Sequence, residues 1–157
     1  MDIIDNFLDR TEFEHIQKIV MSDNFPWYYN KAIADFTDEK HFYYFTHNFF
    51  KNEVKSGLFG LWENFLKKLN YKALIRIKGG LYPSHTKVRP HNFHTDFSFK
   101  HKGCIFYINN NNGSTVIGKK SILPKENRVV LFDPSIPHHS SSCSDQQVRI
   151  TVTFNYF

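Results

Sequence analysis

From residue 73 to residue 157 the sequence is a succession of short runs rich in β-branched and aromatic residues, separated by turn signals such as Gly79-Gly80 and Pro137. Many short strands joined by turns are typical of a β-sandwich or jelly roll and do not suit a parallel sheet. We therefore predict a mostly β fold with N-terminal helices, in which the strands form a cupin-like double-stranded β-helix (jelly roll) of about eight strands. The strands are predicted at residues 73–78, 88–97, 103–109, 114–117, 121–123, 128–132 and 147–157.

The N-terminal part has helical patterns. Thr11 and Glu14 have the form of a capping box, which together with the apolar spacing predicts a helix over residues 12–21. Apolar residues at helical spacing predict a second helix over residues 55–69, packed against the sheet. Aromatic residues crowd the segment 25–50 without clear periodicity, and they either form a substrate-facing lid or fill a small core.

Length and composition favour one domain over residues 1–157, with a helical and aromatic-rich part at 1–72 and the jelly-roll core at 73–157. The net charge of +5 is compatible with an acidic or nucleic-acid partner, but the basic residues are scattered, as on solvated surfaces. Two cysteines imply no disulfide framework, and the first residues lack a basic region followed by an apolar run. We expect a cytoplasmic protein, in the host cytoplasm if the chain is viral, without a transmembrane helix or a membrane partner.

His94 and Asp96 form the most informative motif. In an extended segment residues two apart project from one face, so this imidazole and this carboxylate can reach one metal ion. The best third ligand is one of the pair His138-His139, which follows Pro137. Two histidines and a carboxylate with the opposite positions open suit non-heme Fe(II) enzymes that activate oxygen. By itself, His-x-Asp is a weak signal, because in most sequences it is only a surface histidine near an acid, so the hypothesis depends on the rest of the set.

Arg149 is the second informative residue. It lies in the last predicted strand, where Thr151 and Thr153 share its face because the strand period is two. A guanidinium that points into an apolar barrel is costly unless it meets a carboxylate, which its planar fork binds through two hydrogen bonds. This pattern predicts an anionic ligand inside the barrel. In the alternative, Arg149 lies on an exposed face and the apolar residues between these positions turn inward.

These residues, in this order on late short strands that follow helices, resemble the Fe(II)- and 2-oxoglutarate-dependent dioxygenase superfamily. More narrowly, residues 73–157 are similar to its small phage-type and prolyl-hydroxylase-like members. The similarity lies in Leu81-Tyr82-Pro83, His94-Thr95-Asp96, Gly103-Cys-Ile-Phe-Tyr-Ile-Asn109, Arg128-Val-Val-Leu-Phe-Asp133, Pro137-His138 and Arg149.

The resemblance implies that His94, Asp96 and His138 bind Fe(II), while Arg149 holds the distal carboxylate of 2-oxoglutarate. The resemblance implies O2 as the other cosubstrate. His138 is preferred to His139 because it follows proline as in the family pattern, and adjacent strand residues face opposite ways.

The resemblance also places two tyrosines, Tyr82 and Tyr107, near the cosubstrate, where their phenol groups can hydrogen-bond it; each is equally well interpreted as a core tyrosine. Thr151 or Thr153 adds a hydroxyl beside the arginine. No catalytic residue is expected beyond the metal and cosubstrate ligands, and His85 and His91 are interpreted as non-ligands.

The sequence therefore predicts a 2-oxoglutarate-dependent oxygenase that hydroxylates a peptidyl, prolyl-type or other substrate and releases succinate and CO2. The carboxylate of Asp96 favours hydroxylation, because halogenating relatives lack it. One alternative is a nucleic-acid base demethylase, suggested by the positive charge and the aromatic segment. Another is a non-catalytic, cupin-like metal-binding protein. A peptide, protein or small molecule is favoured over nucleic acid as the partner, and the sequence identifies neither the substrate nor the oligomeric state.

Overall fold

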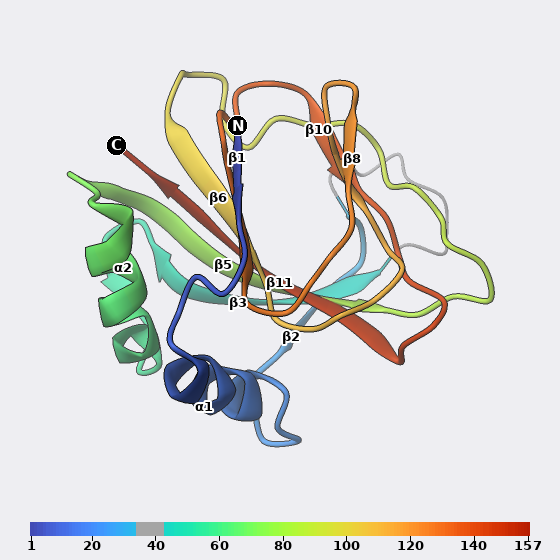
Figure 1. Ribbon diagram of the computed structural model, residues 1–157, viewed down its shortest axis with the longest axis horizontal. Helices are drawn as coiled ribbons and strands as arrows, with labels where there is room; N and C mark the ends of the chain where they lie inside the picture. Colours follow the sequence, from blue (N-terminus) through green and yellow to red (C-terminus); the bar gives the residue numbers. More distant parts are fainter. Residues whose placement is uncertain (34–42) are drawn as a thin grey trace.

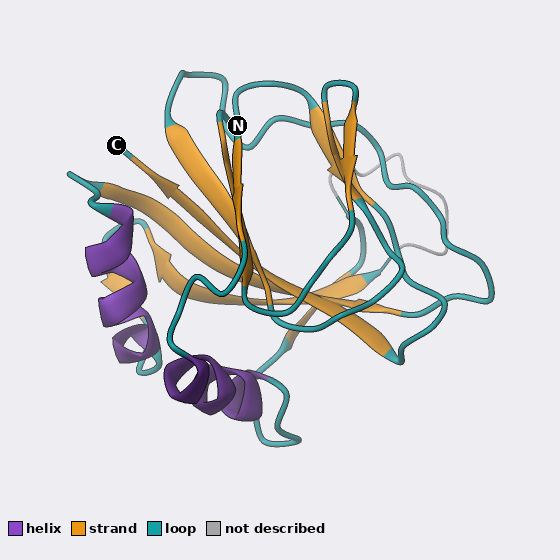
Figure 2. Cartoon of the chain, viewed as in Figure 1, coloured by secondary structure: helices purple, strands orange, loops and turns teal. Residues whose placement is uncertain are grey.

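The structure is a computed structural model that describes residues 1–33 and 43–157. It consists mainly of antiparallel β-strands, with the helices gathered on one side (Figures 1 and 2). The described elements, in chain order, are β1 (Asp2–Ile4), α1 (Arg10–Val20), β2 (Tyr28–Asn30), β3 (Tyr44–Lys51), β4 (Val54–Lys55), the 3-10 turn η1 (Phe59–Trp62), α2 (Glu63–Leu69), β5 (Leu74–Pro83), β6 (Lys102–Tyr107), β7 (Thr115–Ile117), β8 (Lys120–Ile122), β9 (Arg128–Phe132), β10 (His138–Ser140) and β11 (Val148–Tyr156).

The strands form two antiparallel sheets. The large sheet has the order β1-β9-β6-β11-β5-β3-β2, with β4 paired to β3, and the small sheet has the order β10-β7-β8. A hydrophobic cluster joins the two sheets across the interior, because it combines Ile105, Val130 and Phe132 of the large sheet with Ile117 and Ile122 of the small one. This sandwich of curved sheets agrees with the jelly roll predicted from the sequence.

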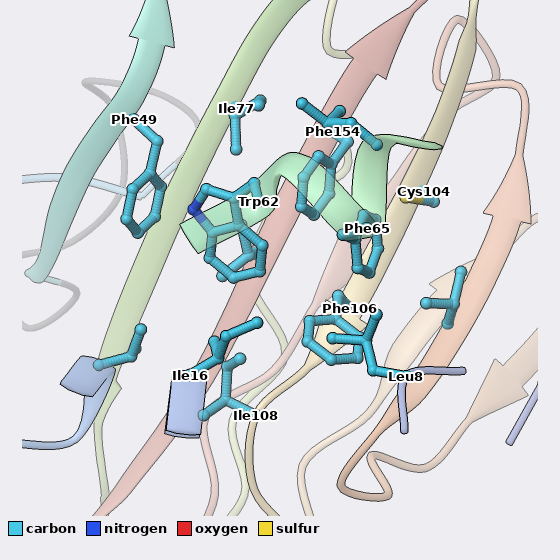
Figure 3. Close-up of a cluster of buried hydrophobic side chains, with 14 of the residues drawn as sticks. Leu8, Ile16, Phe49, Trp62, Phe65, Ile77, Cys104, Phe106, Ile108 and Phe154 are labelled. Carbon is cyan, nitrogen blue, oxygen red and sulfur yellow. The ribbon is translucent and has the colours of Figure 1, made fainter. Parts of the chain in front are cut away.

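The main hydrophobic core lies on the other face of the large sheet, beneath the helices (Figures 2 and 3). Trp62 and Phe65 are fully buried there, and the Phe65 ring stacks on Phe154 of β11 with 4.2 Å between centroids. Helix α1 adds the buried side chains of Phe13 and Ile16. Aromatic side chains of this size dominate the burial of apolar surface, so this core anchors the sheet that carries the site.

Strand β11 is therefore covered on both faces. Its apolar residues Ile150, Val152 and Phe154 belong to the helical core, whereas Arg149 and Thr151 face the interior between the sheets. Arg149 is only 1% exposed, so the alternative in which it lies on an exposed face is wrong. The helices cover the face of β11 that carries its apolar side chains, and the small sheet covers the face that carries Arg149 and Thr151. Both faces of the strand are therefore buried.

The helix predictions need correction. Helix α1 begins at Arg10 after Asp9, whose carbonyl accepts the bond from the N–H of Phe13, and no side chain caps it, so the capping box is wrong. The helix predicted over 55–69 contains only the 3-10 turn and α2, with its first residue paired in β4. Gly57 and Gly60 interrupt the helical periodicity there, and glycine disfavours a helix interior.

Two strand predictions also need correction. Gly79-Gly80 is not a turn but the middle of β5, where added Cβ atoms would lie 3.1 Å from the Trp27 ring and 3.0 Å from the Tyr82 hydroxyl. The absence of side chains at the two glycines lets these rings pack over the strand. The stretch 88–97 forms no strand; it makes two isolated bridges, Pro90 to Ser141 and His94 to His138, and the N–H of His91 donates to the carbonyl of Ser140 at 2.8 Å.

The aromatic residues of segment 25–50 were predicted either to fill a core or to form a substrate-facing lid, and the described ones have different positions. Phe25 and Phe49 lie in the core, whereas Tyr29 and Tyr44 line a cavity. The aromatic residues of 34–42 lie outside the described residues, and the lid stays a prediction.

Cys104 and Cys143 are both buried and free, as expected for a chain without a disulfide framework. Among the described helices, none has the length and apolar character needed to cross a membrane.

Candidate metal centre

Three side chains meet at the open side of the small sheet. The ligand atoms of His94, Asp96 and His138 lie within 4.8 Å of one another. Backbone bonds fix the two histidines, because each N–H donates to the carbonyl of the other at 2.9 Å. A metal ion between them would thus meet side chains held by main-chain pairing rather than by loop conformation alone.

The hydrogen bonds of the imidazoles determine which nitrogen is free. Nδ1 of His94 lies 3.3 Å from the carbonyl of Asn92, and Nδ1 of His138 lies 2.9 Å from that of Ile136. A carbonyl oxygen only accepts, so Nδ1 carries the proton and Nε2 keeps its lone pair in the neutral ring. Burial, followed by the nearby His138, lowers the pKa of His94, which favours that neutral, ligating form.

The carboxylate of Asp96 is held from both sides. Arg76 donates from Nη2 to Oδ1 (2.7 Å), and the amide of Asn155 donates to Oδ2 (2.8 Å). Arg76 Nε also donates to the Asn155 side-chain oxygen (3.2 Å), so Arg76, Asp96 and Asn155 form a closed ring of hydrogen bonds. The Asn155 amide nitrogen additionally lies 3.1 Å from His101 Nε2. Burial alone would raise the pKa of Asp96, but Arg76, Asn155 and Lys78 outweigh it, and the pKa falls below its ordinary value.

The neighbouring histidines lie outside the cluster. The ring of His139 packs edge-on against Phe93, with 4.3 Å between centroids. His91 places Nδ1 2.8 Å from the Ser140 hydroxyl and stacks on Tyr82. Among the described residues, the group of possible metal ligands includes none of His85, His91 and His139.

Arg149 lies further inside the barrel. Its Nη2 donates to Thr115 Oγ1 (2.8 Å), and its Nη1 donates to the carbonyl of Ser141 (3.3 Å). Its Nε has no hydrogen-bond partner, and no ion pair within the described residues includes this guanidinium. The backbone approaches so closely that a Cβ on Gly113 would lie 2.9 Å from Arg149 Cδ. A buried guanidinium without a carboxylate fits an anionic ligand that enters the barrel.

No protein-family model and no curated protein matches the sequence. Solved structures do match. A prolyl hydroxylase from Trichoplax adhaerens, in complex with a hypoxia inducible factor oxygen degradation domain peptide fragment, is 15% identical with a TM-score of 0.64, covering 99% of this chain and 82% of that one. A 2OG-Fe(II) oxygenase family oxidoreductase from Burkholderia pseudomallei is 10% identical with a TM-score of 0.68, covering 98% and 83%. A Pseudomonas putida prolyl-4-hydroxylase is 11% identical with a TM-score of 0.60, covering 99% and 90%.

This chain has the 2OG-Fe(II) oxygenase fold. The double-stranded β-helix predicted from the sequence is thereby confirmed. The likeness extends over nearly the whole chain, including the N-terminal part in which the sequence alone showed no useful similarity.

Within this oxygenase fold the site consists of two connected spaces. The first, called here the inner chamber, has a volume of about 50 Å³ and is lined by His94, Asp96 and His138 together with Arg149, Thr151 and Thr153. The second, the outer cavity, has a volume of about 650 Å³ and shares His94, Asp96, Lys78, Tyr82 and Ser140 with it.

The predicted tyrosines occupy different places in this site. Tyr82 lines both spaces, and burial raises the pKa of its phenol. Tyr107 is fully buried, and its hydroxyl donates to Thr115 Oγ1 (2.8 Å), the atom that also accepts from Arg149. Tyr107 is therefore linked to the guanidinium of Arg149 through Thr115.

Sequence reasoning missed Arg76, Lys78, Thr115 and Asn155. Arg76 and Lys78 alternate with apolar residues along β5, which is the period-two signal of an inward-facing pair. The pairing of Arg76 with Asn155 depends on the register between β5 and β11, which no local pattern reveals.

Proposed function

We propose that the chain is an Fe(II)- and 2-oxoglutarate-dependent oxygenase that hydroxylates a peptidyl, prolyl-type or other substrate and releases succinate and CO2. His94, Asp96 and His138 are the iron ligands, and Arg149 binds the distal carboxylate of 2-oxoglutarate. The observation that carries this proposal is the buried Arg149 without an acidic partner in the described structure, in the same chamber as the His/Asp/His group.

The donor set fits the implied iron. Two imidazoles and one carboxylate match the ligand set of oxygen-activating Fe(II) sites, and such a set leaves the remaining metal positions for exchangeable ligands. When bound, Fe(II) with 2-oxoglutarate and O2 supplies the oxidising power for C–H hydroxylation, which no side chain has. The protein contributes binding, orientation and exclusion of water.

The chamber also fits the implied cosubstrate. Arg149 and Thr115 can donate hydrogen bonds to a carboxylate in the inner chamber. Thr151 and Thr153 add hydroxyls to the wall of the same chamber, which also includes His94, Asp96 and His138. We include Tyr82 and Tyr107 in this cosubstrate pocket, the first as a wall and the second as the support of Thr115.

A peptide is the preferred substrate class. The similar structure from Trichoplax adhaerens is in complex with a peptide fragment, and a viral collagen prolyl hydroxylase from Paramecium Bursaria Chlorella virus-1 is similar at 12% identity and a TM-score of 0.56, covering 99% of this chain and 89% of that one. The outer cavity is lined by His94 and Asp96, and it provides the space in which a substrate side chain would approach the candidate metal centre.

Metal binding by single variants tests the ligand assignment. We expect His94→Ala, Asp96→Ala and His138→Ala to lose tight Fe(II) binding, measured anaerobically by elemental analysis of the purified protein. His139→Ala is the matched control and should retain iron, because its ring packs on Phe93 outside the cluster. Retention of iron by His138→Ala together with loss of iron by His139→Ala would assign the role of third ligand to His139 instead.

Turnover without substrate separates the oxygenase from a non-catalytic metal-binding protein. An oxygenase should decarboxylate 2-oxoglutarate slowly in an uncoupled reaction, whereas a binding protein should not. Succinate formation that depends on iron and disappears in Asp96→Ala supports the oxygenase; no succinate above the Asp96→Ala level contradicts it.

A further inference from the structure

Lys78 is the charged residue of the site that the proposed chemistry leaves without a role. It lies on β5, opposite Thr153 of β11 and Asn48 of β3, and it lines both the inner chamber and the outer cavity. Its ammonium lies 6.0 Å from the centre of the Tyr44 ring. No ion pair and no hydrogen bond of its side chain occurs within the described ranges 1–33 and 43–157.

Among the described residues, the charges around Lys78 do not balance. Asp96 is the one acidic side chain among the described residues of the outer cavity, and it already pairs with Arg76 at 2.7 Å. Removing an ammonium from water without a nearby counter-ion costs free energy, so such a group is retained where a ligand supplies the missing charge.

The proposed cofactors do not supply that charge. Iron would bring two positive charges next to Asp96, and the two carboxylates of 2-oxoglutarate would be taken up by iron and by Arg149. Lys78 would then remain as an excess cation at the boundary where the inner chamber opens into the outer cavity. The matching anion is therefore expected on the molecule that occupies the outer cavity.

The outer cavity also has an aromatic wall. Tyr44 and Tyr82 stack with 5.4 Å between centroids and an interplanar angle of 17°, beside the ammonium of Lys78. The volume of about 650 Å³ lies in the range of ordinary small-ligand sites. An occupant with an apolar or planar part and one anionic group would use both features.

We propose that the outer cavity is the substrate subsite for an anionic group, a carboxylate or a phosphate, with Lys78 as its counter-ion. The substrate is then acidic close to the position of oxidation. This inference rests on the proposed function for the reaction, but the anion subsite itself exists without iron.

The experiment uses small probes with the full-length, metal-free chain at low ionic strength. Phenyl phosphate, phenylacetate and the neutral benzyl alcohol are titrated by calorimetry, and each titration is repeated with an excess of 2-oxoglutarate, which would occupy the inner chamber beside Arg149 and should not displace a probe bound in the outer cavity. We expect both anions to bind more tightly than benzyl alcohol. Tighter binding of phenyl phosphate identifies a phosphate subsite, and tighter binding of phenylacetate identifies a carboxylate subsite.

Lys78→Met is the decisive variant, with Lys120→Met as the matched control, because Lys120 is exposed on β8 and lines neither space. Lys78→Met should weaken both anions at least tenfold and leave benzyl alcohol unchanged, whereas Lys120→Met should leave all three unchanged. The melting temperature of Lys78→Met without ligand should be equal to or above that of the wild type, because a half-buried charge without an ion pair among the described residues is removed.

Two results would overturn the subsite: wild-type affinity of Lys78→Met for both anions, or a lower melting temperature, which would make Lys78 a structural residue. Failure of the proposed function looks different. In that case His94→Ala and Asp96→Ala keep their iron, while the anion titrations are unaffected.

Discussion

At the scale of single residues, the site is defined by how its charges are paired. Asp96 has both oxygens hydrogen-bonded, to Arg76 and to Asn155, whereas Arg149 and Lys78 have no carboxylate partner within the described structure. Polar groups in the interior are retained when they are satisfied or when a ligand satisfies them. Under the proposed function, the paired Asp96 is held in position as an iron ligand, and Arg149 and Lys78 are the two groups at which we expect anions to bind.

The role of Arg149 gives a prediction about 2-oxoglutarate affinity. Arg149→Ala should weaken binding at least tenfold, on the order of 1.4 kcal/mol, because charge-assisted hydrogen bonds to the distal carboxylate are lost. Arg149→Lys should recover only part, since an ammonium keeps the charge but not the planar fork. Anaerobic titration of the iron-loaded variants, followed by the metal-to-ligand absorption of the iron chelate, measures this. Iron content should be unchanged, and wild-type affinity in folded Arg149→Ala would exclude the assignment.

The hydrogen-bond ring around Asp96 gives a prediction about stability. Asn155→Ala leaves Asp96 Oδ2, Arg76 Nε and His101 Nε2 without their partner, in a region where Asn155 is fully buried. The free energy of unfolding in urea should fall by about 1–3 kcal/mol, the cost of unsatisfied buried polar groups. A change smaller than about 0.5 kcal/mol, the range of neutral surface substitutions, would mean that water replaces the amide.

Lys78 gives a prediction about pH. Burial, followed by Arg76 and Lys51, lowers its pKa from 10.5 to about 8 against the opposing effect of Asp96. The unfolded chain then binds more protons between about pH 8 and 10, so stability should rise with pH in that window. Below pH 8 both states are protonated and the destabilising charge is fully present. Urea denaturation of wild type and Lys78→Met at pH 7.5 and 9.5 checks this, because the gain should be absent from the variant.

At the scale of elements, local patterns located the strands of the second half better than the helices of the first. The last strand was predictable because β-branched residues and a period of two agree over β11. The helix over 55–69 failed because Gly57 and Gly60 outweigh the apolar spacing. The long strand β5 failed at Gly79-Gly80, because glycine signals a turn locally while the neighbouring rings of Trp27 and Tyr82 require its small size.

The same distinction explains the site. The grouping of His94, Asp96 and His138 could be predicted because the first two lie on one short segment and His138 follows a recognisable motif; metal binding by this group stays a prediction. Arg76 and Asn155 could not, because they become neighbours only through the register of two strands almost eighty residues apart. Register is a property of the assembled sheet, so it escapes any single-strand pattern.

The connection between the N-terminus and β9 supports a prediction at this scale. Asn127 has a positive φ of 58°, and its side chain accepts from the N–H and donates to the carbonyl of Leu8. Asn127→Ala should lower the free energy of unfolding by about 2–4 kcal/mol, because it loses two buried hydrogen bonds and places alanine in the left-handed region. Asn127→Gly should lose about 1 kcal/mol less, since glycine tolerates this φ. Equal losses in urea would mean that backbone strain contributes nothing.

At the scale of the whole molecule, the large sheet separates two interiors. The helical core on one face includes residues from Leu8 to Tyr156, and the single domain over residues 1–157 stays a prediction. The interior on the other face combines a smaller hydrophobic cluster with the candidate site. The larger core and the candidate site thus lie on different faces of the same strands, so substitutions in one interior should disturb the other little.

The backbone bridge between His94 and His138 has a consequence for the order of folding and metal uptake. The two imidazoles are brought together by main-chain bonds, so the entropy of forming the chelate is lost during folding and not during metal uptake. Zinc fingers represent the opposite case, in which the ion itself drives folding. Chelator treatment should therefore leave the circular dichroism spectrum and the urea m-value unchanged, and the metal-free protein should accept iron at once, without a slow refolding phase.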